Sequence, residues 1–311
     1  MDEREPITEF WVIIQSFMNK SNINFHLNSP AEMGEYSEFH KGNRVFDRGM
    51  VDDFRYNRDF DPLLRNVSLI IPAYNEENRI GPFLDQLSKD LPRSWEVIIV
   101  CDGDDRTADI AREKDVRYKV LEFQRRLGKG GAILEGFRTA SGDIVGYVDA
   151  DGAISVNEII RVFSSISDNC DVAVGSRWIR GSKVTVPQPF LRVVLGRLYH
   201  YMAFALLGIR TKDTQCGLKA FKTSVLAKVL SGVTLKNLSF DTAILYHCYK
   251  AGSRISEVPI TWGDVGGSKV KPVKTALIMF SSLVGLRLAH SDRHRAFDNL
   301  LDSLRRLLEH V

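Results

Sequence analysis

The chain has 311 residues, of which 44% are hydrophobic and 26% charged, and its formal net charge is +3. These values are typical of soluble globular proteins and allow one large α/β domain with appendages, or two domains. The net charge is too small to indicate a nucleic-acid-binding protein. The four cysteines are scattered without a C-x-x-C pair, so we expect neither a zinc site nor a disulfide framework, and a reducing, cytosolic setting is the default.

The first 65 residues are predicted to form an extension outside the main domain. Residues 1–6 are acidic, which is not typical of a signal peptide. Residues 7–18 carry apolar side chains at helical spacing and predict a short amphipathic helix. Residues 21–65 are polar and aromatic-rich without a sustained period, which predicts an irregular extension, with partial disorder as the alternative.

From residue 66 the chain alternates between strand and helix patterns. Strands are predicted over residues 67–71, 96–100, 118–123, 144–148 and 171–175. Helices are predicted over residues 77–91, 130–139 and 156–166, with a further helix after the acidic turn at 101–105. This alternation indicates βαβ units with right-handed crossovers, and therefore an α/β fold built on a parallel sheet.

After residue 181 the alternation lapses. The pattern predicts a long apolar helix over 190–207, a strand over 218–221, helices over 224–230 and 241–251, a strand over 254–262, an amphipathic segment over 274–288, and a docking or self-association helix from 296. The helix 190–207 is either a buried core helix or an interfacial helix with its apolar side chains in a lipid boundary, and residues 276–288 have the same character. No segment reaches the roughly 18 uninterrupted apolar residues of a membrane span, so we do not expect this chain to cross a membrane by itself.

Polar side chains follow three of the predicted strands. Asp149 and Asp151 come directly after the strand 144–148, residues 72–76 follow the first strand, and Asp102 follows the second. Ligands of open α/β sheets bind beyond the carboxyl ends of the strands, and Mg²⁺ is commonly held there by one or two carboxylates and substrate phosphates. Three independent turn caps are the alternative. One nucleotide-sugar site would explain all three, with Asp102 accepting the ring N–H of a base and a metal at the aspartate pair neutralising a diphosphate.

A glycine-rich segment, Gly128-Lys129-Gly130-Gly131, opens the predicted helix at 130–139. Glycines allow close backbone approach, and a helix N-terminus with a lysine attracts phosphate. The segment lacks the spacing of a Walker A loop. The dinucleotide fingerprint G-x-G-x-x-G does not follow the first strand, which argues against an oxidoreductase.

Taken in order, these motifs resemble the family-2 glycosyltransferases of the GT-A fold. The resemblance rests on Ile71-Pro72-Ala73-Tyr74-Asn75-Glu76, Asp102-Gly103, Gly128-Lys129-Gly130-Gly131-Ala132, Asp149-Ala150-Asp151-Gly152, Gly175-Ser176-Arg177, the stretch from Asp213 to Phe221, Phe240-Asp241 and Gly267-Ser268-Lys269. The later motifs are similar to the branch that makes polyprenyl-phosphate sugars, closest to the dolichyl-phosphate β-glucosyltransferases and near the dolichol-phosphate mannosyltransferases. The match covers about residues 66–287.

The resemblance implies a role for each matching residue. The donor-binding residues would be Pro72, Ala73, Tyr74, Glu76, Asp102, Lys129, Asp149, Ala150, Asp151 and Lys269. Asp149 and Asp151 would hold Mg²⁺ or Mn²⁺, and Lys269 lies on a loop expected to close over the donor. The catalytic set would be Asp151, Asp213, Gln215, Asp241, Arg177 and Arg192, with the two arginines on the lipid phosphate.

Three features depart from the family pattern. Cys101 stands where many relatives have a first acidic residue, and Ala243 stands where Phe-Asp-x-Glu would place a glutamate. The extension at 1–65 replaces the membrane helix expected of the eukaryotic glucosyl enzyme. We therefore divide the chain into the extension 1–65, a GT-A domain at 66–265, and a C-terminal part at 266–311 with the donor-site loop, the amphipathic segment and the terminal helix.

The resemblance implies a metal-dependent, inverting transfer of a sugar, with glucose from UDP-glucose favoured, to a polyprenyl phosphate. A phosphate monoester is already anionic, so it needs no strong general base, although Asp213 or Asp241 could serve a hydroxyl acceptor. We expect a peripheral enzyme on the cytoplasmic face of a membrane, with self-association through the terminal helices as an option and no nucleic-acid partner. The alternatives are GDP-mannose or UDP-N-acetylglucosamine as donor, a soluble acceptor, or a non-catalytic nucleotide-sugar-binding scaffold.

Overall fold

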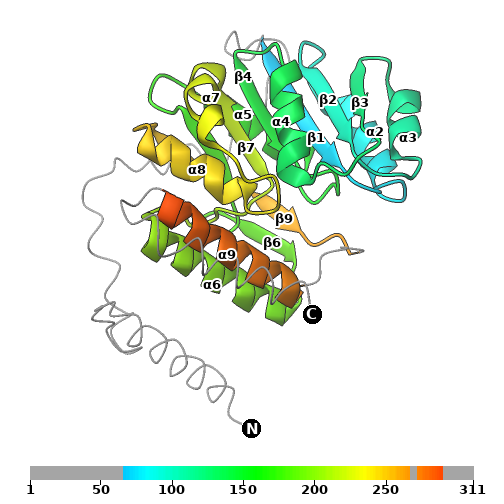
Figure 1. The fold of residues 1–311 in the computed structure, drawn as a ribbon. Coiled ribbons are helices and arrows are strands. Elements are labelled where there is room, and N and C mark those ends of the chain that lie inside the picture. The colour runs from blue at the N-terminus through cyan, green and yellow to red at the C-terminus, as the bar shows by residue number, and fades with distance from the viewer. Residues whose placement is uncertain (1–65, 267–271, 290–311) are drawn as a thin grey trace. The chain divides into compact units, whose positions relative to one another are not determined.

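The computed structural model describes residues 66–266 and 272–289, which all lie in the second of the chain's two units, Arg58–Val311. The helices predicted at 7–18 and from 296, the extension at 21–65 and the donor-loop residue Lys269 fall outside the described residues. Within them the structure is a mixed α/β fold (Figure 1).

The first half of the domain follows the predicted alternation closely. Its elements are β1 (Val67–Ala73), α2 (Ile80–Asp90), β2 (Glu96–Cys101), α3 (Thr107–Lys114), β3 (Tyr118–Glu122), α4 (Lys129–Thr139), β4 (Ile144–Val148), α5 (Val156–Ser164) and β5 (Val172–Ser176). Short apolar runs become buried strands because each is covered on both faces, as the near-continuous burial of β1, β2 and β4 indicates.

The second half contains β6 (Lys183–Val186), α6 (Phe190–Leu207), β7 (Leu218–Lys222), α7 (Thr223–Val229), α8 (Phe240–Lys250), β8 (Ile255–Pro259), β9 (Thr261–Gly263) and α9 (Pro272–Ala289). The strand predicted over 254–262 is wrong as one element, because β8 joins the main sheet while β9 pairs with β6 in a separate ribbon. The fully exposed strand β6 was not predicted at all.

The main sheet has seven strands in the order β3-β2-β1-β4-β7-β5-β8. It is mostly parallel, as predicted, but β7 lies between β4 and β5 and runs antiparallel to both. The late segment at 218–222 therefore occupies the centre of the sheet and carries the residues before it, 213–217, to the carboxyl end of β4. This insertion brings the Asp213 motif beside the Asp149 motif.

Two apolar layers enclose the sheet because side chains alternate along each strand. Leu69 and Ile71 face the layer formed with α2, α3 and α5. Ile70 and Tyr147 face the layer formed with α4, α7 and α8, to which α6 contributes Tyr199 and Ala203. In Figure 1, α6 and α9 lie side by side below α8, at the same end of the domain as the β6–β9 ribbon.

Helix α6 presents an apolar face to solvent. Its bounds agree with the prediction, but only Tyr199, Ala203 and Leu207 are buried. Phe190, Leu191, Val194, Tyr201 and Phe204 are exposed. This pattern excludes the buried core helix and favours the interfacial alternative. Among the described residues α6 is also long and apolar enough to cross a membrane, by length and composition alone, contrary to our expectation that no segment would be.

Candidate active site

Hydrogen bonds of the Asn75 side chain join the loops that follow β1 and β2. Asn75 adopts a φ of 53°, a left-handed conformation that asparagine tolerates better than most residues. Its Oδ1 accepts the Asp104 amide at 3.0 Å, and its Nδ2 donates to Asp104 Oδ1 at 2.9 Å. A Cβ on Gly103 would lie 2.0 Å from Asn75 Oδ1, so this glycine is required for the close approach.

Asp102 is buried at the end of β2 and binds the segment that leads into α4. Its Oδ2 accepts the amides of Leu127 at 2.8 Å and Gly128 at 2.9 Å, and Arg126 Nη1 lies 2.6 Å from both carboxylate oxygens. The guanidinium of Arg126 in turn lies 3.4 Å from the centroid of the Tyr74 ring. The predicted donor residues Asp102 and Tyr74 are therefore brought together, with Asp102 holding the backbone of the glycine-rich segment.

Glu76 is held at the start of α2 by Arg79, which donates to both carboxylate oxygens at 2.7 Å. The same guanidinium donates to the carbonyls of Val265 at 3.3 Å and Gly266 at 3.0 Å. Glu76 is thereby linked, through Arg79, to the segment that precedes the predicted donor loop. Pro72 lies at the end of β1, where the side chain of Ala73 is buried in the core.

Asp149 and Asp151 follow β4 as predicted, with the side chain of Ala150 buried in the core between them. Burial, and then the charge of Asp149, raise the pKa of Asp151 above its usual value. Among the described residues no group of three or more His, Cys, Asp or Glu side chains could hold a metal ion. The pair would fit Mg²⁺ or Mn²⁺ that completes its shell with phosphate oxygens and water, since both side chains offer hard oxygen donors.

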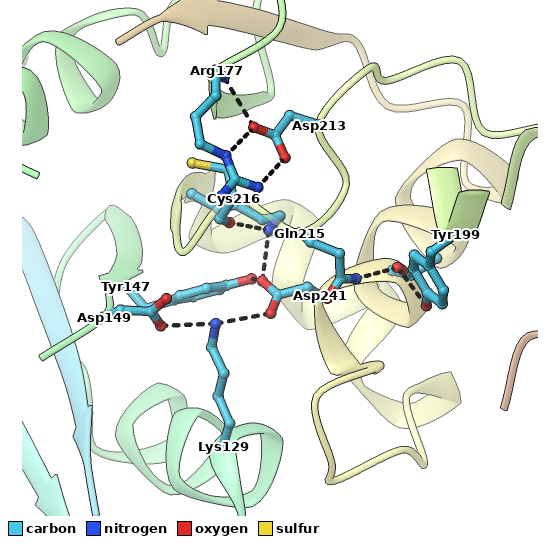
Figure 2. Close-up of polar contacts among 11 residues, drawn as sticks. Lys129, Tyr147, Asp149, Arg177, Tyr199, Asp213, Gln215, Cys216 and Asp241 are labelled. Carbon is cyan, nitrogen blue, oxygen red and sulfur yellow. Dashed lines mark hydrogen bonds and ion pairs between the residues drawn. The ribbon is translucent and has the colours of Figure 1, made fainter. Parts of the chain in front are cut away.

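Lys129, the first residue of α4, lies between two of the predicted carboxylates (Figure 2). Its Nζ is 2.8 Å from Asp149 Oδ1 and 3.0 Å from Asp241 Oδ2. Burial would lower the pKa of Lys129, but the charges of Asp149 and Asp241 outweigh it and raise this pKa above its ordinary value. Lys129 therefore stays protonated and places a positive charge at the carboxyl end of β4.

Asp241, the second residue of α8, is buried and is the centre of a dense polar cluster. Its Oδ1 accepts the Tyr147 hydroxyl at 2.6 Å and the Lys219 ammonium at 2.6 Å, and Lys219 also donates to the Cys216 carbonyl at 2.6 Å. Burial would raise the pKa of Asp241, but Lys129 and Lys219 lower it to about 2. We call Lys129, Lys219, Asp149 and Asp241 the lysine network.

Asp213 and Arg177 form a second ion pair, the arginine pair, above the lysine network in Figure 2. Arg177 Nε and Nη2 donate to the two oxygens of Asp213 at 2.7 and 2.8 Å, and the Arg177 amide donates at 2.9 Å. The Asp213 amide donates to Glu257 on β8 at 3.2 Å, which fixes the aspartate backbone. Asp213 is buried and the Arg177 side chain is 15% exposed, and the geometry is the bidentate one that gives strong, oriented pairs.

A cavity of about 40 Å³ lies beside the arginine pair and is lined by Arg177, Arg192, Arg197, Lys212, Asp213 and Gln215, among others. Gln215 Nε2 donates to Thr242 Oγ1 at 2.7 Å, and the Tyr199 hydroxyl of α6 donates to the same oxygen at 3.0 Å. The structure therefore brings four of the predicted catalytic residues, Arg177, Arg192, Asp213 and Gln215, to one cavity at the base of α6.

The residues of this site that were not predicted include Arg79, Arg126, Tyr147 and Lys219. A signal for Lys219 was present in the sequence. Strand periodicity places it on the same face as Phe221, and a lysine on a core-facing position needs a buried acid as partner. Arg79 and Arg126 lie in polar turns, where the sequence does not distinguish them from solvated arginines.

Comparisons with known proteins show the family to which the chain belongs. The model of the family described as Glycosyl transferase family 2 matches residues 68–230. A dolichyl-phosphate beta-glucosyltransferase of Trichomonas vaginalis is 32% identical over 252 residues, covering 74% of this chain and 76% of the relative. The enzyme of that name from Dictyostelium discoideum is 30% identical over 243 residues, covering 72% and 74%.

Among solved structures, a glucosyl-3-phosphoglycerate synthase from Mycobacterium tuberculosis in complex with Mn²⁺, uridine-diphosphate and glucosyl-3-phosphoglycerate has a TM-score of 0.54. It is 18% identical and covers 72% of this chain and 79% of its own, a likeness of fold. The predicted GT-A architecture is confirmed. The chain belongs to glycosyl transferase family 2 and is a glycosyltransferase.

Proposed function

We propose that this glycosyltransferase moves glucose from UDP-glucose to a polyprenyl phosphate, with inversion, at the cytoplasmic face of a membrane. The names of the relatives support glucose as the sugar and dolichyl phosphate as the acceptor class. The observation that carries the proposal is that the two aspartates that could have served as a general base are both held in ion pairs.

Neither Asp213 nor Asp241 is placed to take a proton from a hydroxyl acceptor. Asp213 is committed to the bidentate contact with Arg177, and Asp241 binds two lysines and a tyrosine with its pKa held to about 2. A carboxylate with so low a pKa has little driving force for accepting a proton from an alcohol at neutral pH. A phosphate acceptor is anionic before it arrives, so the arrangement favours a phosphate over a hydroxyl.

The cavity beside the arginine pair supports an anionic, lipid-linked acceptor. Arg192 and Arg197 belong to α6, and Arg177 and Lys212 flank them, so the cavity gathers positive charge. The same helix exposes Phe190, Leu191 and Val194 to solvent. A phosphate in the cavity and an isoprenoid along the apolar face of α6 would satisfy both features with one substrate.

The donor would bind at the ends of β1, β2 and β4. Tyr74, Asp102 and Glu76 would bound the nucleoside, while the ammonium of Lys129, at the start of α4, would face the diphosphate. When bound at Asp149 and Asp151, Mg²⁺ or Mn²⁺ would supply positive charge for the departing diphosphate. An acceptor phosphate oxygen then forms the bond to the anomeric carbon as the bond to the diphosphate breaks, and UDP leaves with the electron pair.

The test is transfer of radiolabel from UDP-glucose, GDP-mannose and UDP-N-acetylglucosamine to a short polyprenyl phosphate. Each donor is assayed with Mn²⁺ or Mg²⁺, with EDTA, and with the variant Asp151→Asn. The exposed residue Asp168 supplies a matched control, Asp168→Asn, that removes one negative charge away from β4.

We expect label from UDP-glucose in the organic phase, dependent on metal and on Asp151 and unchanged in Asp168→Asn. If another donor is preferred, the transferred sugar is not glucose, but the lipid phosphate is still the acceptor. Donor hydrolysis with no lipid product would refute the polyprenyl phosphate and support a soluble acceptor.

A further inference from the structure

Lys129 is shared between two carboxylates whose surroundings differ. The side chain of Asp149 is 39% exposed at the mouth of the site, whereas that of Asp241 is 1% exposed. The Lys129 side chain itself is 14% exposed. Its ammonium therefore lies at the boundary between a buried acid and an acid that a ligand can reach.

The two aspartates depend on Lys129 to different degrees. Asp241 retains the fully buried Lys219 and the Tyr147 hydroxyl, each at 2.6 Å, if Lys129 moves away. Asp149 has its Oδ1 on Lys129, while its Oδ2 packs against Gly217, where an added Cβ would lie 1.9 Å from that oxygen. Loss of the Lys129 contact would thus leave Asp241 paired with Lys219, but would leave Asp149 without an ion pair in the described part of the chain.

The position of Lys129 allows such a movement without disturbing the backbone. The start of α4 is fixed by the amides of Gly130 and Gly131, which donate to the Lys236 carbonyl at 2.9 and 3.2 Å. Only the flexible side chain of Lys129 has to turn.

We propose that Lys129 is a stand-in cation that holds Asp149 in the metal-free protein and turns to the diphosphate when metal and nucleotide bind together. The inference rests on the proposed metal-dependent transfer and deepens it. Metal binding frees the ammonium for the diphosphate, and a diphosphate that attracts the ammonium frees Asp149 for the metal. The two ligands must then strengthen each other's binding by the same factor.

The experiment measures binding to the full chain, with no turnover. Mn²⁺ affinity without nucleotide is read by electron paramagnetic resonance, and UDP affinity is read by calorimetry with and without saturating Mn²⁺. The variants are Lys129→Met and Lys129→Gln, which both remove the ammonium, so that one remains informative if the other folds poorly. Lys236→Met is the control, because it removes a positive charge near the same helix end from a residue that contacts neither aspartate through its side chain.

In the wild type we expect Mn²⁺ to tighten UDP binding by about tenfold or more, within the usual range of coupling between ligands. In Lys129→Met, Mn²⁺ alone should bind about tenfold more tightly, because a cation in direct contact with Asp149 has gone. The tightening of UDP by Mn²⁺ should shrink by about fivefold, because the diphosphate has lost its lysine. Lys236→Met should change each quantity by less than about twofold.

Three results would overturn the inference. Unchanged Mn²⁺ affinity in both Lys129 variants would show that the lysine does not compete with metal. A gain in Mn²⁺ affinity with undiminished coupling would mean that Lys129 stays on Asp149 and Asp241. Equal effects in Lys236→Met would assign the changes to general charge. If the wild type and the variants bind no Mn²⁺ even with UDP, the metal site of the proposed function falls as well.

Discussion

The arginine pair and the lysine network both neutralise aspartates at the carboxyl end of the sheet, but with different cations. Each buries aspartate charge at the carboxyl end of the sheet, and each places a cation within 3.0 Å of a carboxylate oxygen. Arg177 uses a planar fork and its own amide on Asp213 alone. Lys129 is a point charge divided between Asp149 and Asp241.

The difference follows from the chemistry of the two cations. A guanidinium that donates two parallel hydrogen bonds is oriented by them, so it suits a wall of a phosphate-binding cavity. An ammonium has no preferred plane and rotates among acceptors at little cost, so it suits a position where a ligand replaces one partner. The arginine pair therefore defines geometry, whereas the lysine network allows exchange.

The largest effect is expected from Asp241→Asn, which leaves the buried Lys219 without a full countercharge. Breaking a buried ion pair from one side costs about 3–5 kcal/mol, so the free energy of unfolding in urea should fall by that amount. The control Glu135→Gln breaks the exposed pair with Arg138 and should cost less than about 1 kcal/mol. A small loss in Asp241→Asn would mean that Lys219 finds another acceptor.

Arg177→Lys tests whether the two parallel hydrogen bonds of the guanidinium stabilise the arginine pair. A lysine keeps the charge but cannot donate both parallel bonds to Asp213, so we expect a loss of about 2–3 kcal/mol in unfolding free energy. Transfer to the lipid acceptor should fall through a higher KM for that acceptor, with the donor KM unchanged. Equal increases in both KM values would contradict a role confined to the acceptor cavity.

Gly217→Ala is a steric test of the lysine network. The added methyl would lie 1.9 Å from Asp149 Oδ2, so the carboxylate or the backbone must shift, at a cost of about 1–3 kcal/mol. Mn²⁺ affinity should fall with it. Gly196→Ala in α6 is the matched control, since nothing lies within 4 Å of its added methyl, and a helical alanine should raise stability by up to about 1 kcal/mol.

The smallest effect is expected from Tyr199→Phe, which removes the hydroxyl that α6 donates to Thr242 Oγ1. The loss of one hydrogen bond should cost about 1 kcal/mol in thermal or urea unfolding. Because Gln215 binds the same oxygen, acceptor turnover should change as well. Tyr201→Phe, on the exposed face of α6, removes only an exposed hydroxyl that accepts from Arg197 at 3.3 Å, so it should change the free energy of unfolding by less than about 0.5 kcal/mol. An equal loss of stability in the two variants would contradict a special role of the buried Tyr199 hydroxyl.

Most of the fold was predictable because its signals are local. The strands β1, β2 and β4 and the helix α6 follow from apolar runs, and the predicted bounds differ from the observed ones by two residues at most. The place of β7 was not predictable in this way, because a buried apolar run carries no information on its neighbour or direction. The exposed strand β6 has no burial pattern, and it exists only through its pairing with β9.

The sequence predicted the acidic residues of the candidate site better than the cations that bind them. The family resemblance assigned Asp149, Asp151, Asp213 and Asp241 to one site, and in the structure Asp149 and Asp241 both contact Lys129. The sequence did not identify the cation that each carboxylate would bind, because Lys219 lies on the inserted strand β7 and Arg177 meets Asp213 only where β5 pairs with β7. The roles of Lys269 and of residues 1–65 remain predictions, since these residues lie outside the described part of the chain.

The central position of β7 also has a consequence for synthesis of the chain. Strands β1 to β4 can pair among themselves as soon as residue 148 has left the ribosome, whereas β5 pairs only with β7 and β8. An apolar strand made early must therefore wait for about 40 further residues before it has a neighbour, with both of its edges unpaired. A folding intermediate with an ordered N-terminal half-sheet is the expected nascent species, and chaperones should engage it through β5.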